Sequence, residues 1–243
     1  TLFGISIIEQ DKDHRWEGWH KDVKFYHVLD NESNKHIASF YLDPYSRPGE
    51  KRGGAWMDQL FGKSRALHQD IPVAYLVCNG SPPDDRAGTP SLMTFRDVET
   101  LFHEFGHGLQ HMLTEVEHGG AAGINLVEWD AVELPSQFME NFCYHKDTLL
   151  SFAKHYDTGE VLPMELFEKI VKAKNFQAGM GMTRQLFLGQ LDLELHSTDI
   201  NVNTPSDIQL KIANEYLIMK PLEDDFQLNS FLHIFAGGYS AGY

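Results

Sequence analysis

The sequence predicts a mainly α-helical fold with a small β-sheet, of the α+β class. Runs rich in β-branched and aromatic residues are confined to residues 1–95, whereas helical spacing of apolar residues dominates from there onward. With 243 residues and a hydrophobic content of 42%, the chain can bury one substantial core or two small ones. We therefore expect residues 1–243 to form part of one domain, with a mixed strand and helix portion over 1–95 and a helical portion over 96–243.

Four strand-like runs predict the sheet. They span residues 2–8, 23–29, 36–42 and 73–78, and turn-rich segments separate them at residues 30–34, 45–49 and 79–83. Because the runs are short, we expect a small twisted sheet. In the second portion, residues 163–175 and 205–218 begin with proline and continue with helical patterns, which predicts two helices.

The run over residues 101–109 contains the pattern His-Glu-x-x-His at His103, Glu104 and His107. Apolar residues recur at helical spacing through it, and Asp97 and Glu99 supply the acidic residues of a first turn, so we expect a helix. Histidines four residues apart then share a face, within reach of one tetrahedral ion, with Glu104 beside them to accept the proton of an attacking water. The alternative is an ordinary core helix, although burying these three groups without a metal is costly.

A zinc site with two histidines needs a third ligand and an open fourth position. Glu133 fits best, because Pro135 suits a first helical turn and places Glu133 at the start of a second helix. Glu128 is the competing ligand. The same helix is expected to turn four apolar side chains toward a core: Val132, Phe138, Met139 and Phe142.

Three stretches, over residues 102–109, 129–141 and 233–243, together resemble the thimet oligopeptidase family of zinc peptidases, most closely its oligopeptidase A branch. The resemblance implies a zincin-like metallopeptidase catalytic region that is helical around the metal site. It implies one Zn²⁺ ion on His103, His107 and Glu133, and Glu104 as the general base. It also implies His233 and Tyr239 beside the scissile bond, and short, unfolded peptides as substrates.

The expected chemistry is zinc-dependent hydrolysis of peptide bonds. Glu104 would take a proton from the attacking water and pass it to the leaving amine, while Tyr239 would share the charge of the tetrahedral oxygen with the zinc ion. Asp130 or Glu140 is expected to orient a ligand histidine through its second ring nitrogen. Two alternatives are a zinc-binding fragment that is not catalytically competent alone, and a helical interaction protein whose motif is accidental.

The ends of the chain are expected to lie inside a larger protein. The chain begins at Thr1 without a methionine, in a strand-like run, and the resemblance implies a further tyrosine beyond the last residue. We therefore expect a piece of a metallopeptidase catalytic domain.

Two segments near the motif have two interpretations each. Residues 91–95 are predicted either to form an edge strand that pairs with an extended peptide or to pack as an ordinary part of the sheet. Residues 119–123, Gly-Gly-Ala-Ala-Gly, are predicted either to close over a substrate as a flexible loop or to act as a connector. His111 lies one turn beyond His107, which is too far along the helix axis for a shared ion. The role of Arg184 and Gln185 stays open.

Charge and composition exclude several classes of partner. The formal net charge of -15 argues against nucleic acid and anionic membrane, and no apolar run approaches the length of a membrane helix. Cys78 and Cys143 lie in apolar surroundings and are expected to be buried free thiols in a reducing compartment. We expect a monomeric, cytoplasmic protein, or one in an organelle lumen if the full-length protein carries a targeting segment.

Overall fold

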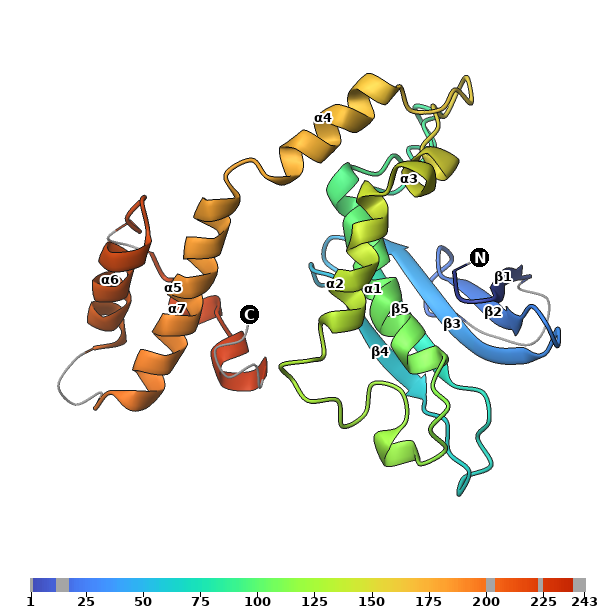
Figure 1. Ribbon diagram of the computed structural model, residues 1–243, viewed down its shortest axis with the longest axis horizontal. Coiled ribbons are helices and arrows are strands. Elements are labelled where there is room, and N and C mark those ends of the chain that lie inside the picture. The colour runs from blue at the N-terminus through green and yellow to red at the C-terminus, as the bar shows by residue number, and fades with distance from the viewer. Residues whose placement is uncertain (1, 12–17, 200–203, 223–224, 238–243) are drawn as a thin grey trace. The chain divides into compact units, whose positions relative to one another are not determined.

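A computed structural model describes residues 2–11, 18–199, 204–222 and 225–237 of the chain. Contacts group the chain into two compact units, Thr1–Leu162 and Pro163–Tyr243. The described strands all lie between residues 5 and 80, and the α-helices begin at Phe95 (Figure 1). The predicted α+β class is confirmed.

The first unit is built on a five-stranded sheet of the described residues, in the order β1-β2-β3-β5-β4. The strands are β1 (Ile5–Gln10), β2 (Lys24–Asp30), β3 (His36–Tyr45), β4 (Trp56–Phe61) and β5 (Val73–Gly80). β3 and β5 pair in parallel, and the other neighbours pair antiparallel. Four strands overlap the predicted runs, whereas β4, at one edge of the sheet, was not predicted.

Helix α1 (Phe95–Met112) covers one face of this sheet (Figure 1). It begins at a capping box, in which the Thr94 hydroxyl accepts a hydrogen bond from the Asp97 amide while the Asp97 carboxylate accepts one from the Thr94 amide. Its apolar stripe packs on the sheet around a core of six buried residues: Val28, Ala38, Phe40, Ala74, Leu76 and Met112. This packing fixes the helix that carries the His-Glu-x-x-His motif.

The prediction that residues 91–95 lie in the sheet is wrong. Residues 91–94 have no strand conformation, and Phe95 already begins α1. The physical reason is local, because Thr94 is committed to capping α1 and the Ser91 hydroxyl donates a hydrogen bond to the Ser81 carbonyl. The edge strand that lies beside α1 is instead β4.

Short helices complete the first unit: η1 (Gly119–Ala121), α2 (Leu134–Glu140), η2 (Asn141–Tyr144) and α3 (Lys146–Phe152). Helix α2 packs beside α1 (Figure 1). Val132 and Met139 are buried as predicted, and Phe142 is half-buried, but Phe138 is 54% exposed. The prediction for Phe138 is wrong because Ser136 and Met139 occupy the buried face of this seven-residue helix.

The second unit is helical in the residues that are described. It contains α4 (Met164–Lys174), α5 (Ala178–Ser197), α6 (Pro205–Tyr216), α7 (Gln227–Ser230) and the π-turn η3 (His233–Gly237). Helices α5 and α6 pack around six buried residues: Phe187, Leu188, Leu191, Ile208, Ile212 and Ala213. Both predicted helices are present, and Arg184 and Gln185 lie exposed on α5.

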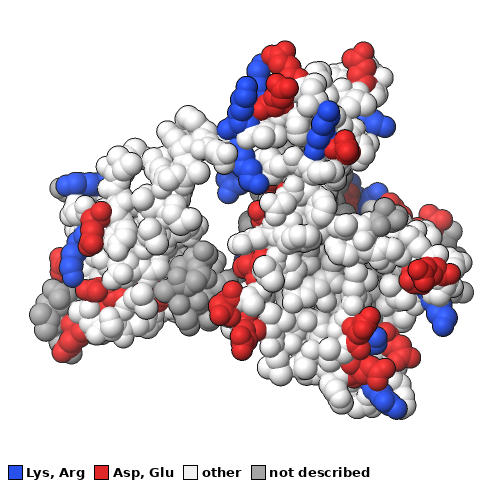
Figure 2. Space-filling view, in the orientation of Figure 1, with Lys and Arg blue, Asp and Glu red and all other residues white. Residues whose placement is uncertain are grey.

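The surface is acidic without one dominant patch on the face shown in Figure 2, where acidic side chains are scattered and several lie beside lysine or arginine. Among the residues that the structure describes, none of the helices combines the length and apolarity that crossing a lipid bilayer requires. Cys78 and Cys143 are both buried and neither forms a disulfide bond, as predicted.

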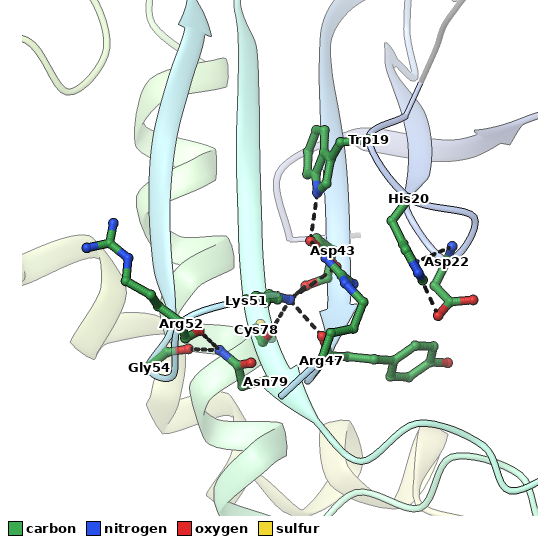
Figure 3. A network of polar contacts seen from close by, with 11 residues as sticks. Trp19, His20, Asp22, Asp43, Arg47, Lys51, Arg52, Gly54, Cys78 and Asn79 are labelled. Carbon is green, nitrogen blue, oxygen red and sulfur yellow. Dashed lines mark hydrogen bonds and ion pairs between the residues drawn. The ribbon is translucent and has the colours of Figure 1, made fainter. Parts of the chain in front are cut away.

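A buried ionic network holds the connection between β3 and β4 (Figure 3). Asp43, only 2% exposed, accepts hydrogen bonds from Arg47 at 2.8 and 2.7 Å and from the Trp19 indole at 2.8 Å. The Lys51 ammonium lies 3.1 Å from the Asp43 carboxylate and donates to the carbonyls of Asp43, Tyr45 and Cys78. Lys51 therefore joins the ends of β3 and β5 to the segment that leads into β4.

Replacing Asp43 by asparagine is expected to lower the free energy of unfolding by about 3–5 kcal/mol at pH 7, because Arg47 and Lys51 lose a buried partner. Burial raises the pKa of Asp43, but hydrogen bonds from Arg47, Trp19 and Lys51 outweigh burial and lower it to about 2. The carboxylate's stabilisation is thus complete above its ordinary pKa near 3.8 and is lost as pH falls through about 2. Urea unfolding at several pH values, with exposed Asp85→Asn as the control, measures both effects; equal stability of the two variants would contradict this role.

Candidate metal centre

Three predicted ligands lie together in the first unit. His103 and His107 project from one face of α1, and Glu133 occupies the N-cap position of α2, which Pro135 helps to start. Glu133 Oε2 lies 3.1 Å from His103 Nε2 and 3.0 Å from His107 Nε2, and one ligand atom from each residue lies within 4.8 Å of the others. The helix spacing and the start of α2 therefore bring two imidazoles and one carboxylate to a single point.

This donor set fits a zinc ion. Tetrahedral zinc with bonds of about 2.0–2.2 Å places its ligand atoms roughly 3.3–3.6 Å apart, close to the two observed separations. Two nitrogens and one carboxylate also leave a fourth position for water or substrate, as in catalytic zinc sites. Glu128, the competing ligand, is exposed and lies outside this group of described residues.

The second nitrogen of His103 is held by Glu140 at the end of α2. His103 Nδ1 lies 2.7 Å from Glu140 Oε1, which directs Nε2 toward Glu133. Burial lowers the pKa of His103, but hydrogen bonds with Glu133 and Glu140 outweigh it and raise the pKa to about 9. The hydrogen bonds that Glu133 makes with His103 and His107 lower the pKa of Glu133 below its usual range. Because a metal ligand must be deprotonated, an incoming ion competes with the proton on His103.

Glu104 lies beside this cluster and is only 6% exposed. Burial raises its pKa, and the charges of His103 and His107 oppose that shift. A raised pKa makes a buried carboxylate a better proton acceptor, as a general base requires. His107 Nδ1 is also buried and has no hydrogen-bond partner among the described residues, so that ring is oriented by its packing and by the contact of its Nε2 with Glu133.

Two residues that sequence reasoning passed over position Glu133. A Cβ atom at Gly106 would lie 2.6 Å from Pro135 O and 2.6 Å from Ser136 Cα, so α1 and α2 approach each other closely only because residue 106 is glycine. The buried Ser136 hydroxyl lies 2.8 Å from Glu133 Oε2 and donates to it. A glycine inside a helical pattern is the signal that was available, since it usually has a packing reason.

The two other predicted site residues, His233 and Tyr239, belong to the second unit. His233 lies in the second unit, at the start of η3, where it is exposed and its ring centroid is 5.7 Å from that of Phe231. Tyr239 lies outside the described residues. Their place beside the scissile bond stays a prediction.

We expect Glu140→Gln to weaken zinc binding about 10-fold to 100-fold, because a neutral amide orients and polarises the His103 ring less well than a carboxylate. Competition with a chromophoric zinc chelator measures the dissociation constant. Glu168→Gln, which changes an exposed carboxylate on α4, is the matched control. A dissociation constant that is the same in both variants would rule out the orienting role of Glu140.

Comparison with known proteins finds a matching family model and several similar proteins. The family model for peptidase family M3 matches residues 1–243. Organellar oligopeptidase A, chloroplastic/mitochondrial, of Arabidopsis thaliana is 53% identical over 250 residues, which cover 100% of this chain and 31% of that protein. The probable cytosolic oligopeptidase A of Arabidopsis thaliana is 52% identical over 100% of this chain and 35% of its own length. Oligopeptidase A of Escherichia coli is 48% identical, with the same two coverages of 100% and 35%. The chain therefore spans about a third of the length of these relatives.

Proposed function

Because the chain belongs to peptidase family M3, we propose that it carries the metal centre of a zinc-dependent oligopeptidase that hydrolyses peptide bonds in short, unfolded peptides. The observation that carries this proposal is the convergence of His103, His107 and Glu133 beside the buried carboxylate of Glu104. The names of the relatives, oligopeptidase A, support the choice of peptide substrates.

In this proposal His103, His107 and Glu133 hold one zinc ion, in a zincin-like arrangement. When bound, zinc supplies Lewis acidity, which polarises a peptide carbonyl and makes water acidic enough to attack near neutral pH. Glu104 accepts the proton of the attacking water at its carboxylate and then donates it to the leaving amine. Glu140 holds the His103 ring in orientation, and Ser136 holds the Glu133 carboxylate.

We assign two further roles to the C-terminal stretch. Tyr239 would donate a hydrogen bond to the oxygen that gains negative charge, and a donor of this kind is worth about 2.7–4 kcal/mol of barrier. His233 would contact the substrate beside the scissile bond. Both assignments rest on the motif over residues 233–243.

A peptide substrate would lie along β4. This strand is an edge of the described sheet and packs beside α1, whose histidines form the metal group. An extended peptide can add to such an edge through main-chain hydrogen bonds, which are indifferent to side chains and therefore suit an enzyme that accepts many short sequences. Most backbone groups of a folded protein are already paired within its own structure, so a folded protein would be a poorer partner for this edge.

The alternative is a zinc-binding fragment that is not catalytically competent alone. The observation that favours it is length, since the chain spans 31% to 35% of its relatives. Both versions place one zinc ion on the same ligands, and they differ only in turnover. We further propose a monomer in the cytoplasm or in an organelle lumen, the two kinds of location named for the Arabidopsis relatives.

Zinc content tests the metal centre independently of turnover. Purified chain is expected to bind about one zinc ion per molecule, and His107→Ala is expected to abolish that binding, because it removes one of three protein ligands. Elemental analysis after dialysis measures the stoichiometry, with exposed His68→Ala as the control. Equal zinc content in wild type and His107→Ala would sink the ligand assignment.

A further inference from the structure

His111 links the metal helix to the edge strand. It lies on α1 four residues beyond His107, is 0% exposed, and its Nε2 is 3.0 Å from the carbonyl oxygen of Phe61, the last residue of β4. Since a carbonyl can only accept, the ring nitrogen must donate. The histidine is therefore a direct polar connection between α1 and the end of β4.

The loop between α1 and α2 packs closely against the His111 ring. A Cβ atom at Gly123 would collide with His111 Nδ1, and Gly123 has a φ of +65°, so both space and conformation require glycine there. His111 Nδ1 is buried and has no partner among the described residues. The polar contribution of this residue is thus the one bond from Nε2 to Phe61.

A second polar contact joins the same loop to β4. The side-chain amides of Gln59 and Asn125 donate to each other, at 3.0 Å in both directions. Asn125 Nδ2 also donates to the Gly119 carbonyl at 2.9 Å. Asn125 thus connects the segment with glycines at 119, 120 and 123 to Gln59 of β4. His111, Gln59, Asn125 and Gly123 form what we call the α1–β4 joint.

We propose that His111 is a positioning residue, which through the α1–β4 joint fixes the edge strand, and hence a peptide paired with that strand, in register with the metal ligands on α1. The inference rests on the proposed function, because it takes the peptide to lie on β4. Main-chain pairing holds the substrate alike in the ground state and the transition state, so loss of the joint weakens peptide binding more than it slows chemistry.

Two replacements of His111 separate its hydrogen bond from its packing. Leucine fills the site without a donor and leaves the Phe61 carbonyl unpaired, whereas glutamine carries an amide nitrogen at a reach similar to that of Nε2. Val28→Ala, a core change on β2, is the control for general destabilisation because β2 pairs with β1 and β3, not with β4. Asn125→Ala tests the joint independently if the leucine variant does not fold.

Three measurements on the zinc-loaded chain, all in a Glu104→Gln background, decide the proposal without turnover. The first is the rate of hydrogen exchange at the β4 amides, with the amides of the other edge strand, β1, as internal reference. The second is the affinity for a fluorescein-labelled unstructured heptapeptide. The third is the affinity for zinc. In His111→Leu we expect β4 exchange and the peptide dissociation constant each to rise roughly tenfold, with zinc affinity within about twofold of the parent. His111→Gln should restore both, and Val28→Ala should speed exchange in β1 and leave β4 unchanged.

Specific outcomes would overturn the proposal. Unchanged β4 exchange in His111→Leu and in Asn125→Ala would show that the joint does not hold the strand. A glutamine variant as impaired as the leucine variant would reduce His111 to a packing residue. Faster β4 exchange with unchanged peptide affinity would show that the peptide does not depend on β4 for its binding. A parent protein that binds zinc but no peptide would instead contradict the proposed function, and β4 exchange would still decide whether His111 holds the strand.

Discussion

Glu104→Gln is expected to retain about one zinc ion per chain and to lower kcat for short peptides by at least about 100-fold, the lower bound of what a general base contributes. Glutamine keeps the shape of the side chain and cannot accept the proton of the attacking water. The candidate ligands are untouched, because the group that could hold a metal ion consists of His103, His107 and Glu133 and does not include Glu104. Elemental analysis for zinc and a fluorogenic peptide assay measure the two effects on the same preparation.

The control for this variant is Glu115→Gln, an exposed carboxylate beyond the end of α1, which should change neither zinc content nor kcat. Retained hydrolysis in Glu104→Gln would remove Glu104 from the general-base role. Loss of zinc would show instead that Glu104 contributes to the metal group.

Gly106→Ala is expected to lower the free energy of unfolding by about 1–3 kcal/mol, the usual effect of inserting a methyl group into a closely packed contact. The added Cβ would lie 2.6 Å from backbone atoms of Pro135 and Ser136, and a backbone cannot move aside as a flexible side chain can. Helix α2 must shift, and Glu133 at its start shifts with it. We therefore also expect zinc affinity to fall at least about tenfold, since ligand distances tolerate only about 0.2 Å.

Gly181→Ala on α5 is the matched control, because nothing lies within 4 Å of the Cβ atom that it would add. There alanine should raise stability by up to about 1 kcal/mol through its better helix propensity. Chemical denaturation and chelator competition on both variants separate the close approach of the two helices from the general effect of replacing a helical glycine. Unaltered zinc affinity in Gly106→Ala would contradict the dependence of Glu133 on this contact.

Strong periodic patterns in the sequence predicted most of the fold. Strands β1, β2, β3 and β5, and the helices over residues 163–175 and 205–218, lie where the patterns placed them. Strand β4 was missed because its run, Trp-Met-Asp-Gln-Leu-Phe, follows a glycine-rich segment and pairs with β5 through a long-range contact that no local pattern encodes. The prediction for residues 91–95 failed for the opposite reason, since the local helix cap at Thr94 outweighed strand propensity.

The part of the candidate site that depends on helix geometry could be predicted from the sequence. Spacing alone put His103 and His107 on one face, and Pro135 indicated where Glu133 would begin its helix. The sequence left Asp130 and Glu140 as alternatives, and the structure places Glu140 against His103 because it lies two turns along α2 from Glu133. The contact of His111 with Phe61 could not be predicted, since Phe61 lies 50 residues away on the strand that was missed.

Peptide cleavage with and without chelator shows whether these residues form a working peptidase centre. The purified, zinc-loaded chain is incubated with a mixture of short peptides and one folded protein, and the products are identified by mass spectrometry. We predict that the peptides are cleaved, that the folded protein stays intact, and that a chelator stops the reaction until zinc is restored. Cleavage that persists without zinc, or no peptide cleavage by a chain that holds its zinc, would contradict the claim that these residues form a working peptidase centre in this chain.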